Sequence, residues 1–305
     1  MPIIGEAIGD AAAAGIRQWV RLTGKHVAKR DAPWLDCPMG PPGGIGPEFY
    51  DQLAEREQLQ IRPTPDAGLL ADFAELKGAS FDPTRVRPEI RDFYRHTSSY
   101  RLEAWSDAPV PTRFFLWALT TFVSRRMEQL NFPVSSLELA RGMTSEVLPM
   151  VDAAGTVAYR GWLRRLVDPE RVLYAGLYSV GQPPGYPDPC VKVSFPLPFG
   201  SSTVFLRPEA QSDGSFRLIS SGSKFGEPGF YRMVEVDQDH WKVWYISTMR
   251  EIFHVYVDKR GILRTNHTVH FFGLTPLRLH YKLERATSTD RDPLPQQTSP
   301  RVVDA

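Results

Sequence analysis

The feature that most constrains this chain is a long series of segments, from about residue 156 to residue 285, in which apolar and polar residues alternate. Alternation with a period of two residues is typical of β-strands that bury one face. Short polar turns join the segments, for example at residues 212–214 and 259–261. Since no stretch long enough for a parallel crossover separates them, the pattern predicts about ten antiparallel strands paired in sequence order. An open sheet of that size leaves edges and twists heavily, so we expect it to curl into a barrel.

The first half of the chain shows helical periodicity instead. The spacing of its apolar residues predicts an amphipathic N-terminal helix and three later helices, over Asp66 to Lys77, Pro88 to Thr97 and Thr112 to Asn131. The last of these has so wide an apolar stripe that it needs a sheet or a bundle to lie against. The predicted fold class is therefore α+β, with a helical N-terminal half packed on a large antiparallel, mainly meandering β-sheet that is curled into a barrel.

Composition divides the chain into segments. Prolines and glycines break regular structure after the first helix, which predicts a connector, and the polar, proline-rich C-terminal end predicts disorder. The expected segments are an amphipathic helix at 1–31, a connector at 32–65, a helical region at 66–150, a barrel-like region at 151–286 and a disordered tail at 287–305.

Charge and cysteine content exclude several classes of protein. Lys and Arg number 36 against 35 Asp and Glu, so no overall field attracts nucleic acid. The two cysteines, Cys37 and Cys190, are too few for a disulfide framework or a zinc knuckle, which favours a reducing, cytoplasmic location. Glu6 and Asp10 interrupt the apolar N-terminus, which argues against a signal peptide. The longest apolar run, residues 114–123, is about half as long as a membrane span, so we expect no transmembrane segment. No sequence pattern indicates the oligomeric state.

The end of the predicted N-terminal helix is basic. Arg17, Arg21 and Lys25 accumulate on its later turns with no acidic residue among them. A basic amphipathic helix can lie on an anionic membrane or in the groove of a partner. Cations near a helix C-terminus are also what the helix dipole favours. Peripheral membrane contact and a purely structural role are therefore both open at this stage.

The stretch SSGSKFGEPGFYR, residues 220–232, is rich in glycine, as phosphate-binding loops are. Such loops lead into the N-terminus of a helix, whereas this stretch leads into a predicted strand, so we reject nucleotide binding. The stretch is better interpreted as a loop between neighbouring strands. Its Lys224 is either a contact for an anionic head group at the mouth of the barrel or an ordinary solvated lysine.

The predicted hairpin between residues 250 and 272 can be given a register from its turn. If Lys259-Arg260-Gly261 is a three-residue loop with a left-handed glycine, Asp258 pairs with Ile262 and every later pair follows. A register shifted by one residue would mix apolar and charged side chains on both faces. The predicted inner face carries Glu251, Phe253, Val255, Val257, Leu263, Thr265, His267, Val269 and Phe271. The predicted outer face carries Arg250, His254, Tyr256, Arg264, Asn266, Thr268 and His270.

On the predicted inner face, Glu251 is diagonal to His267 and within reach of it. Burial raises the pKa of a carboxyl group and lowers that of an imidazole unless both are charged together, which is how acid/base pairs are prepared for catalysis. Such a pair can also be an ordinary structural network. Because His254 and His270 point to the opposite face, three metal ligands do not converge, and we expect no metal site.

Three functions are compatible with this sequence. A barrel of this size can hold one small ligand, so the first hypothesis is binding of an apolar or amphipathic, lipid-like small molecule. The second is an acid/base enzyme of the isomerase, cyclase or dehydratase type, in which Glu251 and His267 move protons on an apolar substrate. The third is an interaction protein whose core is filled by its own side chains. None of the three calls for a cofactor. The candidate ligand-binding residues are Lys224, Tyr231, Trp241, Tyr245, Phe253 and Thr265.

Overall fold

The computed structural model describes residues 14–40, 48–107, 143–166, 171–197 and 199–286. These parts of the chain form mostly antiparallel β-sheet together with three helices, which is an α+β fold. The helices are residues 14–23, α2 (Phe49–Arg56) and α3 (Pro88–Arg95). The predicted helix from Thr112 to Asn131 and the predicted tail at 287–305 lie outside the described residues.

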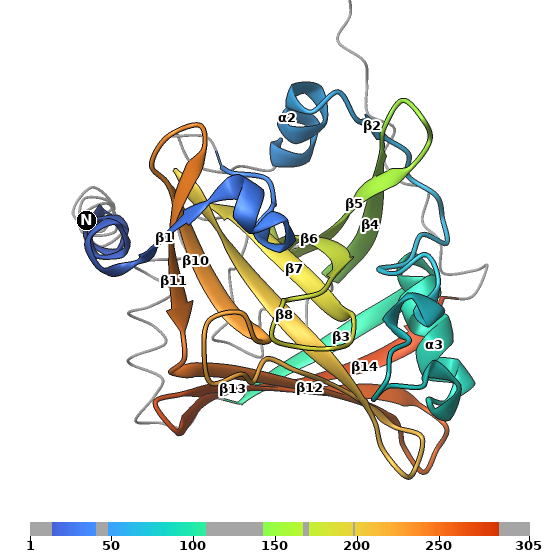
Figure 1. Ribbon diagram of the computed structural model, residues 1–305. Helices are drawn as coiled ribbons and strands as arrows, with labels where there is room; N and C mark the ends of the chain where they lie inside the picture. Colours follow the sequence, from blue (N-terminus) through green and yellow to red (C-terminus); the bar gives the residue numbers. More distant parts are fainter. Residues whose placement is uncertain (1–13, 41–47, 108–142, 167–170, 198, 287–305) are drawn as a thin grey trace, which may run out of the picture.

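The strands form two layers that share the long strand β8 (Gly200–Ala210), as Figure 1 shows. The first layer runs in the order β2 (Gln60–Ile61), β4 (Met143–Val151), β5 (Val157–Leu166), β6 (Arg171–Gly181), β7 (Cys190–Leu197), β8, β10 (Gly229–Glu235), β11 (His240–Ile246) and β1 (Lys25–Ala28). The second layer runs from the end of β8 through β9 (Phe216–Ile219), β12 (Met249–Val257), β13 (Leu263–Phe271), β14 (Leu274–Arg285) and β3 (Tyr100–Asp107). Strands of the second layer cross those of the first at a steep angle (Figure 1).

The sheet divides at β8, so the prediction of one closed, meandering barrel is wrong. Residues Gly200–Phe205 of β8 pair with β10, whereas Arg207–Ala210 pair with β9. The chain returns after β9 to place β10 beside the first part of β8, and β12 then pairs with β9. Strands β2 and β3 end the path, and no ladder joins them within the described residues. Two stacked layers bury their apolar faces against each other, which removes the need to close a ring.

The main hydrophobic core lies between the two layers. One end of this core is closed by α3 and by the 3-10 helix η3 (Phe73–Leu76). There the ring of Phe216 in β9 lies 5.1 Å from that of Phe73 and 5.5 Å from that of Tyr94, measured between ring centroids. Core side chains of the first layer include Val147, Trp162, Val193, Val204, Leu206 and Phe230, and those of the second include Phe216, Val255, Leu263, Leu279 and Leu283.

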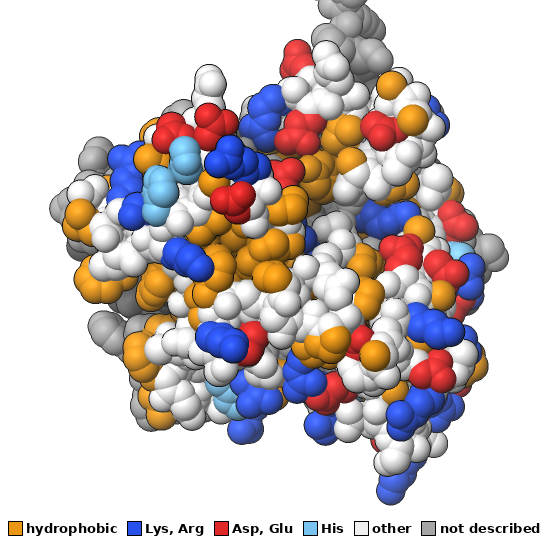
Figure 2. Space-filling view, viewed as in Figure 1, with side chains coloured by type: hydrophobic (Ala, Val, Ile, Leu, Met, Phe, Trp, Pro, Cys, Tyr) orange, Lys and Arg blue, Asp and Glu red, His pale blue; other side chains and the backbone are white. Residues whose placement is uncertain are grey.

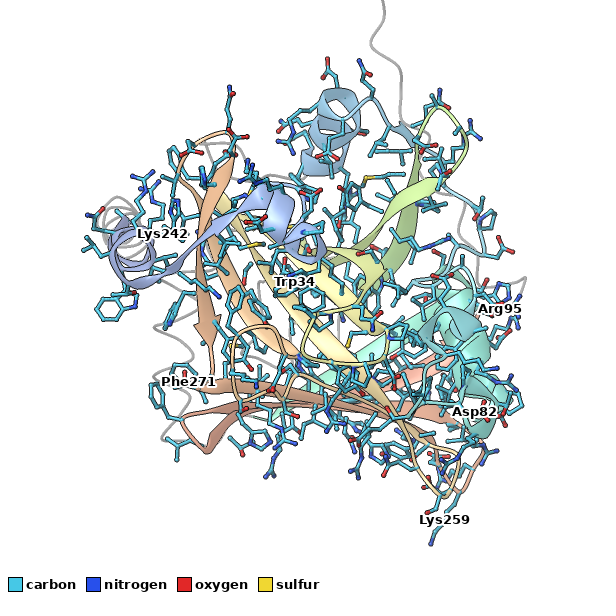
Figure 3. The ribbon with its side chains drawn as sticks, in the orientation of Figure 1. Trp34, Asp82, Arg95, Lys242, Lys259 and Phe271 are labelled. Carbon is cyan, nitrogen blue, oxygen red and sulfur yellow. The ribbon has the colours of Figure 1, made fainter. Side chains whose placement is uncertain are left out.

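The other face of the first layer is also covered. Helix α2 packs Phe49, Tyr50 and Leu53 against β4, β5 and β6. The segment from β1 to the 3-10 helix η2 (Pro33–Leu35) covers β8, β10 and β11. Trp34 of η2 lies over this face (Figure 3), where apolar side chains gather in the space-filling view (Figure 2). The first layer is therefore buried on both sides.

The helical N-terminal half is only partly found. Helix α3 confirms the prediction of a helix that begins at Pro88, but residues 66–77 contain only the short helix η3. A Cβ atom on Gly68 would lie 2.2 Å from the carbonyl oxygen of Arg95. This segment therefore packs closely on the end of α3 and does not form the predicted helix. The N-terminal helix stops at residue 23, because Lys25–Ala28 pair with the edge of β11. The sequence pattern does not predict α2, β3 or β4.

Candidate functional site

The register predicted for the β12–β13 hairpin is confirmed. The backbone N–H of Asp258 donates to the carbonyl of Ile262 at 2.9 Å, and Gly261 has the left-handed φ of +78°. Phe253 consequently pairs with His267, and their shared face points into the core between the layers. Lys259 marks the tip of this hairpin in Figure 3.

Glu251 and His267 meet on this inner face, as the diagonal pairing predicts. The Nε2 atom of His267 lies 3.7 Å from Oε1 of Glu251. The imidazole is 5% exposed and stacks on Phe253 with 3.9 Å between ring centroids. Its Nε2 atom has no hydrogen-bond partner among the described residues. Because 3.7 Å is longer than a hydrogen bond, both groups keep the capacity to bind a third polar group.

The facing layer adds polar groups to the same region of the core. The hydroxyl groups of Tyr174 and Tyr178, both on β6, are hydrogen-bonded at 2.9 Å. Burial raises the pKa of Tyr178; the hydrogen bond with Tyr174 and the charge of Arg164 oppose this rise, while Glu251 and Tyr281 add to it. Tyr178 therefore stays a neutral hydrogen-bond donor at ordinary pH, and it senses charges from both layers. We call Arg164, Tyr174, Tyr178, Glu251, His267 and Tyr281 the inter-layer cluster.

Arg164 is the most unusual member of the inter-layer cluster. It is 9% exposed, and its guanidinium carbon lies 4.4 Å from the ring centroid of Trp162, 4.3 Å from that of Tyr174 and 5.6 Å from that of Tyr281. Its Nε atom has no hydrogen-bond partner, and no carboxylate of the described residues forms an ion pair with it. Arginine is rarely buried unless an anion pairs with it. Three aromatic faces stabilise the cation in part but supply no counter-charge.

Local strand geometry explains how the first layer presents these groups. Arg164 pairs with Tyr174 across β5 and β6, and the ladder shifts register between Arg164 and Arg165. Gly176 makes room beside them, since a Cβ atom there would lie 2.9 Å from the hydroxyl oxygen of Tyr174. Such irregularities redirect side chains locally. Sequence reasoning missed Arg164, although strand alternation places it on the same face as the core residue Trp162.

The residues predicted to bind a ligand lie on opposite sides of the first layer. Phe253 and Thr265 lie in the core beside the inter-layer cluster, and Thr265 pairs with Tyr281 of β14. On the opposite face of β10 and β11, three predicted residues pack in the cluster under η2: Tyr231, Trp241 and Tyr245.

Lys224 also lies away from the inter-layer cluster. Its side chain is 76% exposed, and its Nζ atom is 3.9 Å from Glu227 in the same loop. The loop itself packs through Phe225. Its ring centroid lies 5.7 Å from that of Trp34, and the Lys25 ammonium lies over the Phe225 ring, 4.5 Å from the centroid. The middle of the glycine-rich loop thus covers the η2 face. Its first residue, Ser220, accepts a hydrogen bond from the backbone N–H of Glu251, and Phe230 near its end packs in the main core.

A cavity of about 430 Å³ opens where β5 and β6 approach the segment before η3. Tyr178 belongs both to its lining and to the inter-layer cluster, so the cavity reaches the outer limit of that cluster. Arg160, also in the lining, donates a hydrogen bond to the carbonyl of Gly68 at 3.2 Å. Burial lowers the pKa of Arg160, and the charge of Glu75 opposes this shift. The remaining lining residues are Leu69, Leu70, Ala71, Val157, Ala158, Tyr159, Ser179 and Val180.

Among the described residues, no three His, Cys, Asp or Glu side chains gather as metal ligands would. None of the helices in these parts of the chain has both the length and the apolar character of a membrane span.

Comparison with known proteins finds a relative of unknown function. No protein-family model and no solved structure matches the chain. It is similar to the uncharacterized membrane protein YndJ of Bacillus subtilis (strain 168), with 24% identity over 251 residues. The match covers 78% of this chain and 41% of the relative, so the chain spans well under half of that protein's length. Because this relative is named a membrane protein, the expectation of a cytoplasmic location is corrected: the likeness points to a membrane location.

Proposed function

We propose that this chain binds an amphipathic, lipid-like small molecule whose acidic head group is held at the inter-layer cluster. The observation that carries the proposal is Arg164, a buried guanidinium with no carboxylate partner among the described residues. A buried cation without a counter-charge costs free energy, and an anionic ligand would offset that cost. The planar guanidinium is also suited to binding a carboxylate or phosphate with two hydrogen bonds.

Other parts of the site support an amphipathic ligand. Glu251 and His267 are separated by 3.7 Å and can share a hydroxyl or acidic group of the ligand. The surrounding side chains are apolar or aromatic, which suits an aliphatic tail. The cavity that includes Tyr178 offers a route from solvent toward the cluster. A lipid-like ligand also fits the membrane-protein name of the Bacillus relative.

The test compares Arg164→Gln with Arg165→Gln, using a fluorescent long-chain fatty acid and the alcohol of the same length as probes. Arg165 is the matched control, because it follows Arg164 in β5 and its charge acts on a carboxyl group: burial raises the pKa of Glu146, and Arg165 opposes this rise. We expect Arg164→Gln to weaken binding of the acid at least tenfold, roughly the value of one charge-assisted hydrogen bond. Binding of the alcohol should change much less, and Arg165→Gln should affect neither probe.

Thermal unfolding without a probe separates a ligand site from a structural role. Since the cation pairs with no carboxylate of the described residues, Arg164→Gln should leave the Tm unchanged or raise it. A large fall in Tm, or equal loss of binding for acid and alcohol, would show that Arg164 serves packing and would refute the proposal.

The second candidate function is acid/base catalysis, favoured by the buried approach of Glu251 to His267. A proton-transfer enzyme would incorporate deuterium from D2O into the carbon chain of a bound unsaturated fatty acid, which mass spectrometry detects. Glu251→Gln keeps the shape and should reduce that exchange by about 100-fold or more. A passive binder shows no exchange with either protein, and its affinity should change by only about 1 kcal/mol.

A further inference from the structure

Exposed apolar side chains occur at two separate elements of this molecule. On the helix at residues 14–23, Trp19 is 54% exposed and Leu22 is 72% exposed. At the turn between β13 and β14, Phe272 is 70% exposed and Leu274 is 65% exposed. Large apolar side chains gathered in this way mark an interaction surface, whereas single ones are ordinary.

The two elements lie along one edge of the molecule. Lys25, just after the helix, pairs with Val243 of β11. The backbone N–H of Phe272 donates to the carbonyl of Thr248, shortly after β11 ends. A few residues of β11 therefore connect the helix to the turn. In Figure 3, Phe271 lies on the same side of the molecule as the N-terminal helix. We call Trp19, Leu22, Phe272 and Leu274 the apolar edge.

The turn within the apolar edge has an unfavourable residue for its conformation. Phe272 and Gly273 connect β13 to β14 as a two-residue turn, with φ values of +49° and +78°. Turns with two left-handed residues favour Asn-Gly, and an aromatic residue at the first position is strained. Its ring contacts that of Phe271 with 4.7 Å between centroids, yet Phe272 remains 70% exposed, so packing among the described residues leaves most of the side chain in solvent.

Both parts of the apolar edge are flanked by cations. Arg17, Arg21 and Lys25 accompany the helix, and no acidic residue occurs between residues 14 and 30. Beside the turn, Arg250 pairs with His270 on the neighbouring strand, and Arg278 follows on β14. Burial lowers the pKa of His270, and the charges of Arg250 and Arg278 lower it further, as expected where cations gather.

We propose that the apolar edge docks on an anionic lipid bilayer, with its four side chains inserted among the head groups and the flanking cations on the lipid phosphates. Trp and Phe beside Lys and Arg are the side chains that suit a membrane interface. The cations of residues 14–30, a stretch without Asp or Glu, complement the negative surface of such a membrane. A protein partner would more commonly meet a contiguous patch with a mixed polar rim. This inference does not depend on the ligand proposed for the inter-layer cluster.

The test is flotation of the full chain with phosphatidylcholine vesicles that contain or lack phosphatidylserine. We expect binding to the anionic vesicles at low salt and at least tenfold weaker binding to neutral ones. Phe272→Asn should reduce binding to anionic vesicles at least fivefold, while the resulting Asn-Gly turn keeps or raises the Tm. The pair Arg21→Gln and Lys25→Gln should remove the preference for phosphatidylserine. Val157→Thr changes an exposed apolar residue on β5, far along the sheet order from β11, and should have no effect.

Several results would overturn the proposal. One is failure of the unmodified chain to float with anionic vesicles at low salt. Another is binding that Phe272→Asn and Val157→Thr reduce equally. If the chain instead forms a dimer in solution that Phe272→Asn dissociates, without any vesicle binding, the apolar edge is an interface between two copies.

Discussion

At the scale of single residues, the chain shows how a buried charge is normally satisfied. Asp188 has no exposed surface and accepts hydrogen bonds from the backbone N–H groups of Ala79 and Ser80, at 2.6 and 2.8 Å. Burial raises the pKa of Asp188, but these bonds and the Ser80 hydroxyl outweigh it and hold the pKa below its usual range. Gly78 leaves the space that this arrangement needs, since its Cβ would lie 2.3 Å from the carboxylate. Arg164 differs from this complete pairing, because no carboxylate among the described residues forms an ion pair with it.

Asp258 allows a prediction about acid stability. Its carboxylate accepts from Arg264 Nε at 2.5 Å and from the backbone N–H groups of Arg260 and Ile262. The hydrogen bond with Arg264 is the main cause that lowers the pKa of Asp258 to about 2. Because the folded pKa is below the unfolded value, this contribution to stability is complete above about pH 4 and is lost as the pH falls toward 2.

Asp258→Asn should therefore lower stability at pH 7 and reduce the loss of stability between about pH 4 and pH 2. Urea unfolding at a series of pH values measures both effects. Asp31→Asn is the control, since Asp31 is an exposed carboxylate whose nearest cation, Arg30, is 3.7 Å away. Parallel pH curves for the unmodified chain and Asp258→Asn would contradict the prediction.

At the scale of elements, α2 is the clearest case of a helix held by what it covers. Its eight residues are too few to be stable alone in water. Leu53 is fully buried against the first layer, and the Tyr50 hydroxyl donates to the carbonyl groups of Trp162 and Gly176 at 3.1 and 3.2 Å. Those two carbonyls belong to β5 and β6, the strands that carry the first-layer members of the inter-layer cluster.

Leu53→Ala should destabilise the protein by about 2–5 kcal/mol, since it leaves a cavity beneath α2. Gln52→Ala, on the exposed side of the same helix, should change stability by less than about 0.5 kcal/mol. Denaturant midpoints at a constant m-value give both numbers. If the two substitutions cost the same, α2 does not pack on the first layer as described.

At the scale of the whole molecule, the shared strand β8 joins the two layers into one structure. The first part of β8 pairs with β7 and β10, and its last residues pair with β9. Phe216 of β9 is fully buried and contacts the rings of Phe73, Phe81 and Tyr94 at the closed end of the core. Loss of one layer would thus expose the apolar face of the other.

Phe216→Ala should cost about 3–5 kcal/mol and should shift the unfolding of both layers together. Coincident far-UV and near-UV circular dichroism transitions test this cooperativity. Val236→Ala, at a residue that is 47% exposed, should stay within about 0.5 kcal/mol of the unmodified chain. Two separated transitions in Phe216→Ala would show that the layers unfold independently.

The sequence alone determined the features that depend on neighbours along the chain. Alternation and turn residues predicted the strands from β5 to β14, and Gly261 fixed the register that brings Glu251 to His267. Only the tertiary structure decided how those strands are shared between two layers and which faces meet. The division at β8 depends on competition between β9 and β10 for one strand, which no local pattern records. The contact between Arg164 and Tyr281 across the core could not be predicted from the sequence. Both faces of the first layer are buried, so its strands lack the apolar-polar contrast that shows which side chains point inward.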